Sequence, residues 1–159
     1  MAHNAHTLGV GGWVVNEAGA VLLVRMTYGP AQGRLMIPGG HADDGELLPQ
    51  TAVREVREET GIEAEPRGLL MVRQRLLDAD RNLYLVFWMT PTGGRTQPDG
   101  SEVSEAVWLT PAEILTRDDI QPIAREVAAA WQSHPGAALA ERALDWQDAT
   151  TYRLWAGIE

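Results

Sequence analysis

The strongest pattern in this chain is the stretch GHADDGELLPQTAVREVREETGI, residues Gly40–Ile62. It reads, without a gap or substitution, as glycine, five residues, glutamate, seven residues, then Arg-Glu-apolar-any-Glu-Glu-any-Gly-apolar. At a usage of roughly 7% per residue type, such a match arises by chance about once in 10⁷ chains of this size. Its fixed positions are Gly40, Glu46, Arg54, Glu55, Glu58, Glu59 and Gly61.

The second half of this stretch predicts a helix over Pro49–Thr60. Proline suits a first helical turn, where its missing N–H is not needed, and Gly61 suits the left-handed position that ends a helix. At about 100° per residue, such a helix has three faces. They are a core face of Ala52, Val53, Val56 and Thr60, a second face of Gln50, Arg54 and Arg57, and an acidic face of Glu55, Glu58 and Glu59.

The acidic face predicts a site for a divalent cation. Its glutamates are three and four residues apart, where like charges repel, and a bound cation would compensate this repulsion. Hard cations such as Mg²⁺ take oxygen ligands, and carboxylates beside a glycine-rich turn supply them. A solvated acidic face is the alternative for Glu58 and Glu59 alone, and the spacing to Gly40 and Glu46 argues against it. Arg54 lies four residues before Glu58 and is expected to pair with it.

Composition limits the class of protein. A chain of 159 residues is long enough for one domain, which we place at residues 1–159. It has no cysteine, which excludes disulfides and thiolate sites and fits a reducing compartment, so we expect the cytoplasm. We see no signal peptide and no membrane span. The formal net charge of −9 disfavours a nucleic-acid polymer, whereas a small anionic substrate can bind through a metal.

Before and after the acidic helix, short apolar runs between turn signals predict strands. We expect a β-hairpin from His6–Val15 and Ala20–Met26, joined at residues 16–19. A strand over Arg34–Ile37 should stop at Pro38-Gly39-Gly40. Further strands are expected at Leu69–Leu77, Leu83–Thr90 and Ala106–Leu109, with a loop over Pro91–Ser101.

The last third of the chain reads as mostly helical. Thr110 and Glu113 predict a capping box, and longer helices are expected at Asp119–Ser133 and Ala137–Trp146, with a break at Pro135-Gly136. Alternating strands and helices predict an α/β sandwich with a mixed sheet. The core is placed at residues 7–116 and a helical extension at 117–159. Tryptophans in this extension either bury a homodimer contact or pack on their own domain: Trp131, Trp146 and Trp155.

Taken together, the 40–62 stretch resembles the Nudix box, and the chain resembles the Nudix hydrolases of the MutT type. Segments outside the box sit where the family carries similar strands, and the resemblance covers about residues 7–116. The segments that match these strands are residues 11–15, 21–25, 35–40 and 105–109. The resemblance implies an α/β/α sandwich, Mg²⁺ or Mn²⁺ as cofactor, and hydrolysis of a nucleoside diphosphate linked to another group.

Carried over position by position, the resemblance implies roles for the box residues. Glu55, Glu58 and Glu59 would ligate the metal, with the carbonyl of Gly40 as a further ligand. Arg54 would orient a glutamate, and Glu46 would hold the loop or an outer metal shell. In this family the general base is either a box glutamate, here Glu58, or an acid on a later loop. The loop candidates are Glu102 and Glu105.

Substrate contacts are expected just before the box. Arg25 and Arg34 are candidates for steadying phosphate charge, with Gly39 beside them, although exposed strand arginines are an equal interpretation. Likewise, Glu102 is either the base or a solvated loop charge. Leu47 stands where the family often has a capping serine, so the start of the helix should differ.

Three functions were weighed. The first is a metal-dependent diphosphate hydrolase acting on a small nucleotide, which every box position supports. The second is a non-catalytic Nudix-like sensor that binds a nucleotide, which a degraded box would favour. The third is the related isoprenoid diphosphate isomerase, whose chemistry calls for a cysteine that the chain lacks. The substrate itself is left open.

Overall fold

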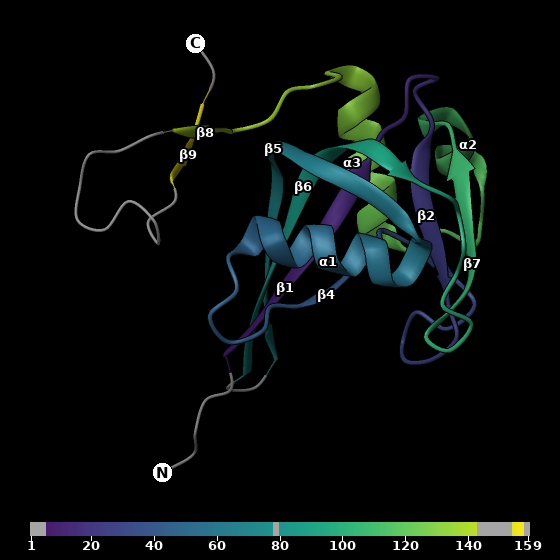
Figure 1. Ribbon diagram of the computed structural model, residues 1–159, viewed down its shortest axis with the longest axis horizontal. Helices are drawn as coiled ribbons and strands as arrows, with labels where there is room; N and C mark the ends of the chain where they lie inside the picture. Colours follow the sequence, from purple (N-terminus) through teal and green to yellow (C-terminus); the bar gives the residue numbers. More distant parts are fainter. Residues whose placement is uncertain (1–5, 78–79, 143–153, 158–159) are drawn as a thin grey trace.

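The computed structural model describes residues 6–77, 80–142 and 154–157 (Figure 1). Its strands fall into a four-stranded sheet in the order β4-β1-β6-β5, a three-stranded sheet in the order β3-β2-β7, and the pair β8-β9. In chain order, the elements are β1 (His6–Val14), β2 (Val21–Met26), β3 (Leu35–Met36), β4 (Gly39–His41), α1 (Leu48–Thr60), β5 (Ile62–Leu77), β6 (Asp80–Gly94), β7 (Val103–Leu109), α2 (Pro111–Thr116), α3 (Pro122–Ser133), β8 (Ala140–Arg142) and β9 (Leu154–Ala156).

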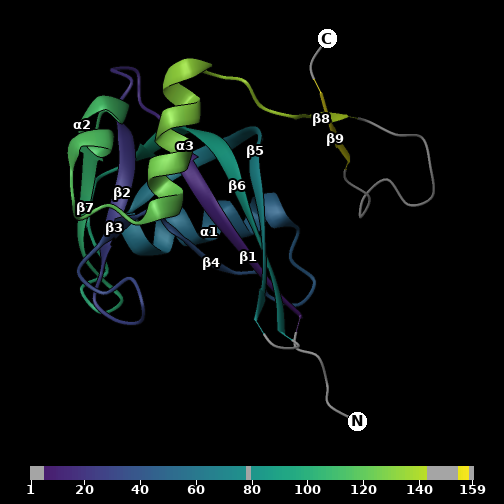
Figure 2. The same cartoon turned by 180° about the vertical axis from the view of Figure 1, so that it is seen from behind.

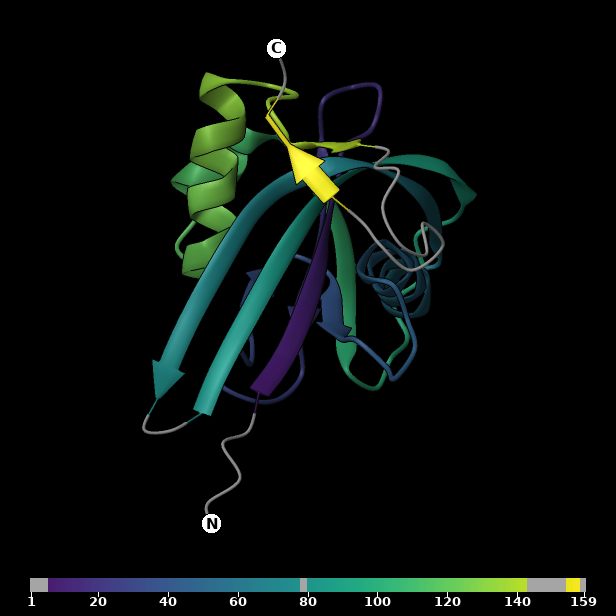
Figure 3. The same cartoon turned by 90° about the vertical axis from the view of Figure 1, so that its left-hand side faces the viewer.

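The four-stranded sheet lies between two helices. Within it, β1 runs parallel to β6 and antiparallel to β4, and β5 runs antiparallel to β6. Helix α1 covers one face (Figure 1), and α3 covers the other, as the view from behind shows (Figure 2). The long strands β5, β6 and β1 lie side by side in Figure 3. The predicted α/β/α sandwich with a mixed sheet is therefore confirmed.

Alternation along β1 divides the core into two parts. Successive strand side chains point to opposite faces of a sheet. Trp13 is buried on the α3 side, with Ala124 and Val127 of that helix. Val10 and Val14 are buried on the α1 side, with Val56 and other residues of that helix. Because α3 contributes to the first part, the helix closes the core.

The predicted hairpin is wrong in its pairing, although both strands exist. Strand β1 belongs to the four-stranded sheet and β2 to the three-stranded one, and a single bridge, Val15 to Val21, joins them. The turn at residues 16–19 is present, with the Gly19 N–H donating to the Asn16 carbonyl at 2.9 Å. The fully buried runs 10–14 and 21–24 require packing on both faces, so the two strands separate and lie in different sheets.

Pro38-Gly39-Gly40 was predicted to stop a strand, and β3 does end before it, at Met36. The glycines themselves were not expected to form a strand. Gly39–His41 forms β4, which pairs with Gly9–Gly11 of β1. A Cβ atom on Gly39 would come within 2.7 Å of the Gly11 Cα atom. Because Gly39 has no side chain, the backbone of β4 can approach β1 closely. The sequence pattern alone had suggested only a turn here.

The helix predicted over Ala137–Trp146 is wrong over residues 137–142, none of which is helical. Residues 140–142 form β8, and residues 143–146 lie outside the described residues. Just before β8, Leu139 exchanges two backbone hydrogen bonds with Leu69 of β5, at 2.8 and 2.9 Å. The free edge of β5 thus holds this segment extended, and tertiary pairing overrides its local helical preference.

Other predicted elements are confirmed, with changed bounds. Strands β5 and β6 are longer than expected, so the loop predicted from Pro91 begins only after Gly94. At the start of α2, the Thr110 N–H donates to the Glu113 carboxylate at 2.7 Å and the Glu113 N–H to the Thr110 hydroxyl at 3.2 Å, as a capping box requires. No helix in the described part of the chain combines the length and apolar character of a membrane span.

Candidate functional site

Helix α1 carries the acidic face, and its two ends are fixed locally. At its start, the Leu47 N–H donates to the Gln50 side chain at 2.9 Å, so Gln50 takes the capping role that Leu47 cannot fill. Pro49 lies in the first turn. At its end, Gly61 has a φ of 75°, and its N–H donates to the Arg57 carbonyl at 2.9 Å. These contacts confirm the predicted helix and its terminators.

The three faces of α1 also follow the prediction. Ala52, Val56 and Thr60 are buried, and Val53 is half-buried, which confirms the core face. On the acidic face, exposure rises in steps from the interior to solvent. Glu59 is 3% exposed as a residue, and the side chains of Glu55 and Glu58 are 14% and 53% exposed.

Strand β4 meets the acidic face directly. The Gly39 N–H donates to Glu59 Oε2 at 2.9 Å. A Cβ atom on Gly40 would lie 2.5 Å from the carboxyl carbon of Glu55, so only glycine leaves room for that carboxylate. The box therefore joins two elements: α1 supplies the carboxylates, and the glycine strand lies against them.

Arg54 binds most of these acids at once. Its guanidinium contacts both oxygens of Glu46, at 2.8 and 3.0 Å, and one oxygen of Glu55 at 2.8 Å. The predicted pair with Glu58 is confirmed at 3.2 Å. The His41 carbonyl also accepts from Arg54, at 3.1 Å. Thr51 adds a hydroxyl donor to Glu46 at 2.7 Å, so Glu46 ties the loop to the helix.

The acids remain in electrostatic excess despite Arg54. Burial, together with the charges of Glu55, Glu102 and Asp99, raises the pKa of Glu59 to about 8, although the Gly39 N–H opposes this shift. Burial also raises the pKa of Glu55. By contrast, hydrogen bonds from Arg54 lower the pKa of Glu46 to about 2. Ionised carboxylates in this position call for a positive charge.

The residues of this face fit a hard divalent cation. Oxygen donors of the glutamates and of the Gly40 carbonyl are the ligand type that Mg²⁺ and Mn²⁺ prefer. Among the described residues, no group of three His, Asp or Glu side chains is arranged closely enough to hold a metal ion. In this structure, the carboxylates of Glu55 and Glu58 are instead paired with the guanidinium of Arg54.

Glu102 lies close enough to this face to affect it. Its charge contributes to the raised pKa values of both Glu55 and Glu59. The loop that carries it is held by the Thr27 N–H, which donates to the Glu102 carbonyl at 3.0 Å. The Tyr28 hydroxyl donates to the Glu102 carboxylate at 3.4 Å. The structure thus brings together Glu102 and the box acids.

Glu105 and Arg25 occupy a different place, across the β2–β7 pair. Arg25 donates to Glu105 at 2.6 Å, to Asp119 at 3.0 Å and to the Gly33 carbonyl at 2.8 Å. Asp119 is also bound by Arg117 at 2.7 and 2.8 Å. Among the described residues, no ion pair connects this group to α1, and each of its charges is already matched.

The remaining candidates lie at the edges of these groups. Arg34 reaches the backbone carbonyls of Asp118 and Ile120, at 3.3 and 3.4 Å. Two of the three tryptophans of the predicted extension pack on their own domain. Trp131 contacts Trp88 at 5.3 Å between ring centroids, and Trp155 contacts Phe87 at 5.4 Å. Trp146 lies outside the described residues.

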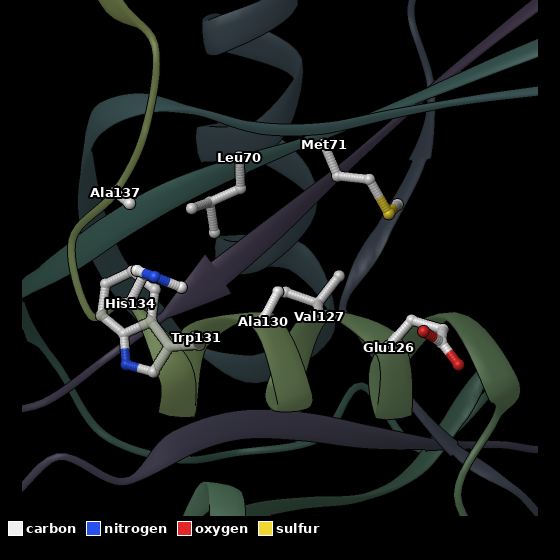
Figure 4. Close-up of a pocket in the computed structure, with 8 residues that line it drawn as sticks. All are labelled: Leu70, Met71, Glu126, Val127, Ala130, Trp131, His134 and Ala137. Carbon is white, nitrogen blue, oxygen red and sulfur yellow. The ribbon is translucent and has the colours of Figure 1, made fainter. Parts of the chain in front are cut away.

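Two cavities lie between β5 and α3. The larger, of about 500 Å³, is mostly apolar, with Leu70 and Met71 facing Val127, Ala130 and Trp131 across it (Figure 4). A smaller one of about 80 Å³ lies at the other end of α3, between Arg73, Tyr84 and Gln121.

Sequence reasoning missed Asp119 and Arg73. Neither belongs to a recognisable motif, and only the contacts that each makes across the fold identify it. For Asp119, the one available signal was its place two residues after Arg117, within reach of an ion pair.

Comparison with known proteins places the chain in a family. The family model described as NUDIX domain matches residues 5–131, so the chain belongs to this family. It is similar to Nudix hydrolase 2 of Arabidopsis thaliana, with 30% identity over 124 residues, which cover 76% of this chain and 45% of that protein. It is also similar to the 8-oxo-dGDP phosphatase NUDT18 of Mus musculus, with 35% identity over 105 residues, covering 64% of this chain and 32% of that protein.

The match extends to solved structures. A NUDIX hydrolase from Nitrosomonas europaea superposes with a TM-score of 0.72 and 24% identity, over 85% of this chain and 74% of that chain. At this identity, the likeness supports the fold alone. The chain spans less than half the length of both relatives, 45% of the first and 32% of the second. The MutT-type Nudix assignment made from the box is confirmed.

Proposed function

We propose that this chain is a Mg²⁺-dependent hydrolase that cleaves the diphosphate linkage of a nucleoside diphosphate joined to another group, either a nucleoside triphosphate or a nucleotide conjugate. The observation that carries the proposal is the acidic face of α1, where the buried Glu59 and the half-buried Glu55 lie against the glycines of β4. Membership of the NUDIX family supports it, as do the names of the relatives, which are hydrolases and a phosphatase.

The metal would be held by Glu55, Glu58 and Glu59 with the Gly40 carbonyl, and Mn²⁺ is an acceptable substitute for Mg²⁺. When bound, such a cation neutralises phosphate charge and lowers the pKa of a coordinated water. Arg54 contacts one oxygen of Glu55 and one of Glu58, so the second oxygen of each carboxylate would be available to the metal. Glu46 would then keep Arg54 in place through its two contacts.

The general base is proposed to be Glu58 or Glu102 rather than Glu105. Glu58 is the most exposed carboxylate of the acidic face. Glu102 lies on a neighbouring loop, and its charge raises the pKa values of Glu55 and Glu59. Glu105 is bound by Arg25 at 2.6 Å, which leaves it poorly placed to accept a proton from water. Such a base contributes about 10²- to 10⁴-fold to rate.

Substrate contacts are proposed at the β4 backbone, beside Gly39, and at Arg34. Arg34 donates only to backbone carbonyls at 3.3 and 3.4 Å among the contacts described, so a phosphate can compete for it. Arg25 is less suited to this role, because Glu105, Asp119 and a carbonyl already accept from its guanidinium.

We also propose that the chain acts as one domain over residues 1–159, with a core that continues past residue 116 because α3 contributes Ala124 and Val127 to it. We further propose that it acts in the cytoplasm, where a protein without cysteine needs no oxidising conditions. Light scattering would measure whether the chain forms a homodimer.

A panel assay tests the proposal. Phosphate release, coupled to a phosphatase, would be followed for nucleoside triphosphates, nucleotide sugars, dinucleotides and ADP-ribose, with and without Mg²⁺. Turnover that requires Mg²⁺ and is lost in Glu58→Gln, but kept in the exposed control Glu63→Gln, supports it. A folded protein that binds Mg²⁺ and nucleotide without turning over any member of the panel would instead be the nucleotide sensor.

A further inference from the structure

The small cavity between β5 and α3 contains polar atoms that lack partners. The Tyr84 hydroxyl and the Arg73 Nε are both shielded from solvent, and neither has a hydrogen-bond partner. Leaving such groups unpaired in a buried place costs stability, and native structures keep few of them. Both residues line the cavity, so a ligand that enters it and reaches these groups would supply the missing acceptors.

Arg73 is positioned there by the fold. It lies opposite Tyr84 in the β5–β6 register, and its guanidinium carbon lies 5.5 Å from the centre of the Tyr84 ring. This contact holds a flat guanidinium over an aromatic face. In the part of the chain that the structure describes, no carboxylate forms a salt bridge with Arg73.

Tyr84 connects this cavity to the box. It pairs with Gly9 across β1 and β6, and a Cβ atom on Gly9 would lie 2.8 Å from its ring. A Cβ atom on Gly11 would overlap its hydroxyl. Gly11 pairs with Gly39 of β4, whose N–H donates to Glu59. The cavity and the acidic face therefore lie on opposite sides of the same two glycine strands.

The polar groups around the cavity act mainly as donors. The side-chain oxygen of Gln121 already accepts from the N–H groups of Ile123 and Ala124, at 2.8 and 3.2 Å. Any further contact that it makes is therefore best made by its amide N–H group. Burial and the charge of Glu59 raise the pKa of Tyr84, so its hydroxyl stays protonated. The guanidinium of Arg73 can only donate.

The size of the cavity limits what enters it. At about 80 Å³, and with a water taking about 30 Å³, it admits the edge of a ring rather than a whole nucleotide. Its other walls are apolar side chains, including Met36, Ile37 and Ile123. Apolar walls with a few convergent polar groups are typical of sites that recognise a flat organic ring.

We propose that Arg73 and Tyr84 form a base-selection pocket, which favours nucleotides whose base carries a carbonyl, at purine position 6 or pyrimidine position 4, over those with an amino group there. A carbonyl oxygen accepts from Arg73 and Tyr84, whereas an amino group would meet the Arg73 guanidinium, which can only donate, with another donor. The inference rests on the proposed function, because it assigns the nucleotide preference of the proposed hydrolase. A pocket built from buried donors rejects a ligand that leaves them unpaired.

Binding measurements test this pocket without relying on turnover. The probes are α,β-methylene analogues of nucleoside diphosphates in two matched pairs, inosine against adenosine and uridine against cytidine, with Mg²⁺. Each pair differs only around one carbonyl or amino position. In calorimetry on the full chain, the carbonyl member of each pair should bind at least tenfold more tightly.

Three variants assign the preference to the pocket. Arg73→Met and Tyr84→Phe should bring the ratio within each pair toward one, with little change in affinity for the adenosine analogue. Arg75→Met is the matched control, because Arg75 lies exposed on the same strand, and its ratio should equal that of the wild type. Circular dichroism would verify that each variant is folded.

Two results would overturn the proposal. One is equal affinity within both pairs for the wild type. The other is an Arg73→Met protein that weakens every analogue and inorganic pyrophosphate alike, because Arg73 would then contact phosphate. Base-selective binding without any turnover in the panel assay would leave the pocket intact and refute the hydrolase function, while turnover without base preference would do the reverse.

Discussion

Two arginine–carboxylate groups in this protein differ in their balance of charge. In the first, Arg54 contacts Glu46, Glu55 and Glu58, and the buried Glu59 lies beside them. Asp43 also forms an ion pair with Arg54, at 3.6 Å, so one cation lies among five acids.

In the second group, Arg25 and Arg117 face Glu105 and Asp119, so two cations meet two acids. Hydrogen bonds from Arg117 and Arg25 hold the pKa of Asp119 well below its usual range. Burial raises the pKa of Glu59 instead. A surplus of buried negative charge indicates a place for a cation, whereas a neutral group at the surface serves the fold.

The largest expected effect is on kcat, and it distinguishes the Arg54 group from the Arg25 group. Glu58→Gln removes a carboxylate from the group around Arg54, where acids outnumber cations, and should lower kcat by about 10²- to 10⁴-fold. Glu105→Gln removes one from the neutral group and should leave kcat within about threefold, because Arg25 keeps Asp119 as a partner. Steady-state kinetics with Mg²⁺, on proteins of equal thermal stability, would measure both. Equal losses in the two variants would contradict the distinction.

The second prediction concerns the pH dependence of stability in EDTA. Because the pKa of Glu59 is raised to about 8, the folded protein retains a proton that the unfolded chain has released above about pH 4.5. Unfolding free energy should therefore fall as pH rises through this window, by on the order of 3 kcal/mol.

Glu59→Gln has no proton to lose and should show a flatter profile, while its Gln can still accept from the Gly39 N–H. Urea unfolding at pH 5 to 8 would compare the two proteins, with Glu63→Gln as a surface control. Parallel profiles for wild type and Glu59→Gln would show that Glu59 titrates as an ordinary exposed acid. Mg²⁺ should remove most of the difference, because it binds the ionised form.

A third prediction tests the glycine strand. Gly40→Ala adds a Cβ atom where the Glu55 carboxylate now lies, so the carboxylate must move. We expect about a 10- to 100-fold loss of Mg²⁺ affinity, the size found when metal-site surroundings are disturbed. Calorimetric titration with Mg²⁺ would measure it, and an unchanged affinity would show that Glu55 reaches the metal from another rotamer.

The smallest expected effect lies in the neutral group. Asp119→Asn leaves Arg25 and Arg117 with one fewer acid and should cost about 1 kcal/mol at pH 7, because the pair is partly exposed and screened. The pKa of Asp119 is depressed in the folded state, so its contribution is present above the unfolded pKa and is lost as pH falls below it. Urea unfolding at pH 7 and pH 3 should show the gap between variant and wild type shrinking in acid.

Sequence reasoning succeeded where the cause is local. Pro49 and Gly61 mark the ends of α1, the capping box of Thr110 and Glu113 starts α2, and residue spacing alone places Glu55, Glu58 and Glu59 on one helical face. It failed where partners are distant. The hairpin at the start of the chain separated into two sheets, and residues 140–142 were held extended beside β5.

The sequence by itself determined the family, the acidic helix and the residues suited to bind a cation, because these depend on residue type and on spacing within one element. Only the tertiary structure decided which charges remain unmatched. Glu105 and Arg25 were both reasonable candidates until the pairing of β2 with β7 placed them against each other. Likewise, Arg73 and Tyr84 meet only because β5 pairs with β6. Contacts between distant strands depend on the register of the sheet, and no short stretch of sequence encodes that register.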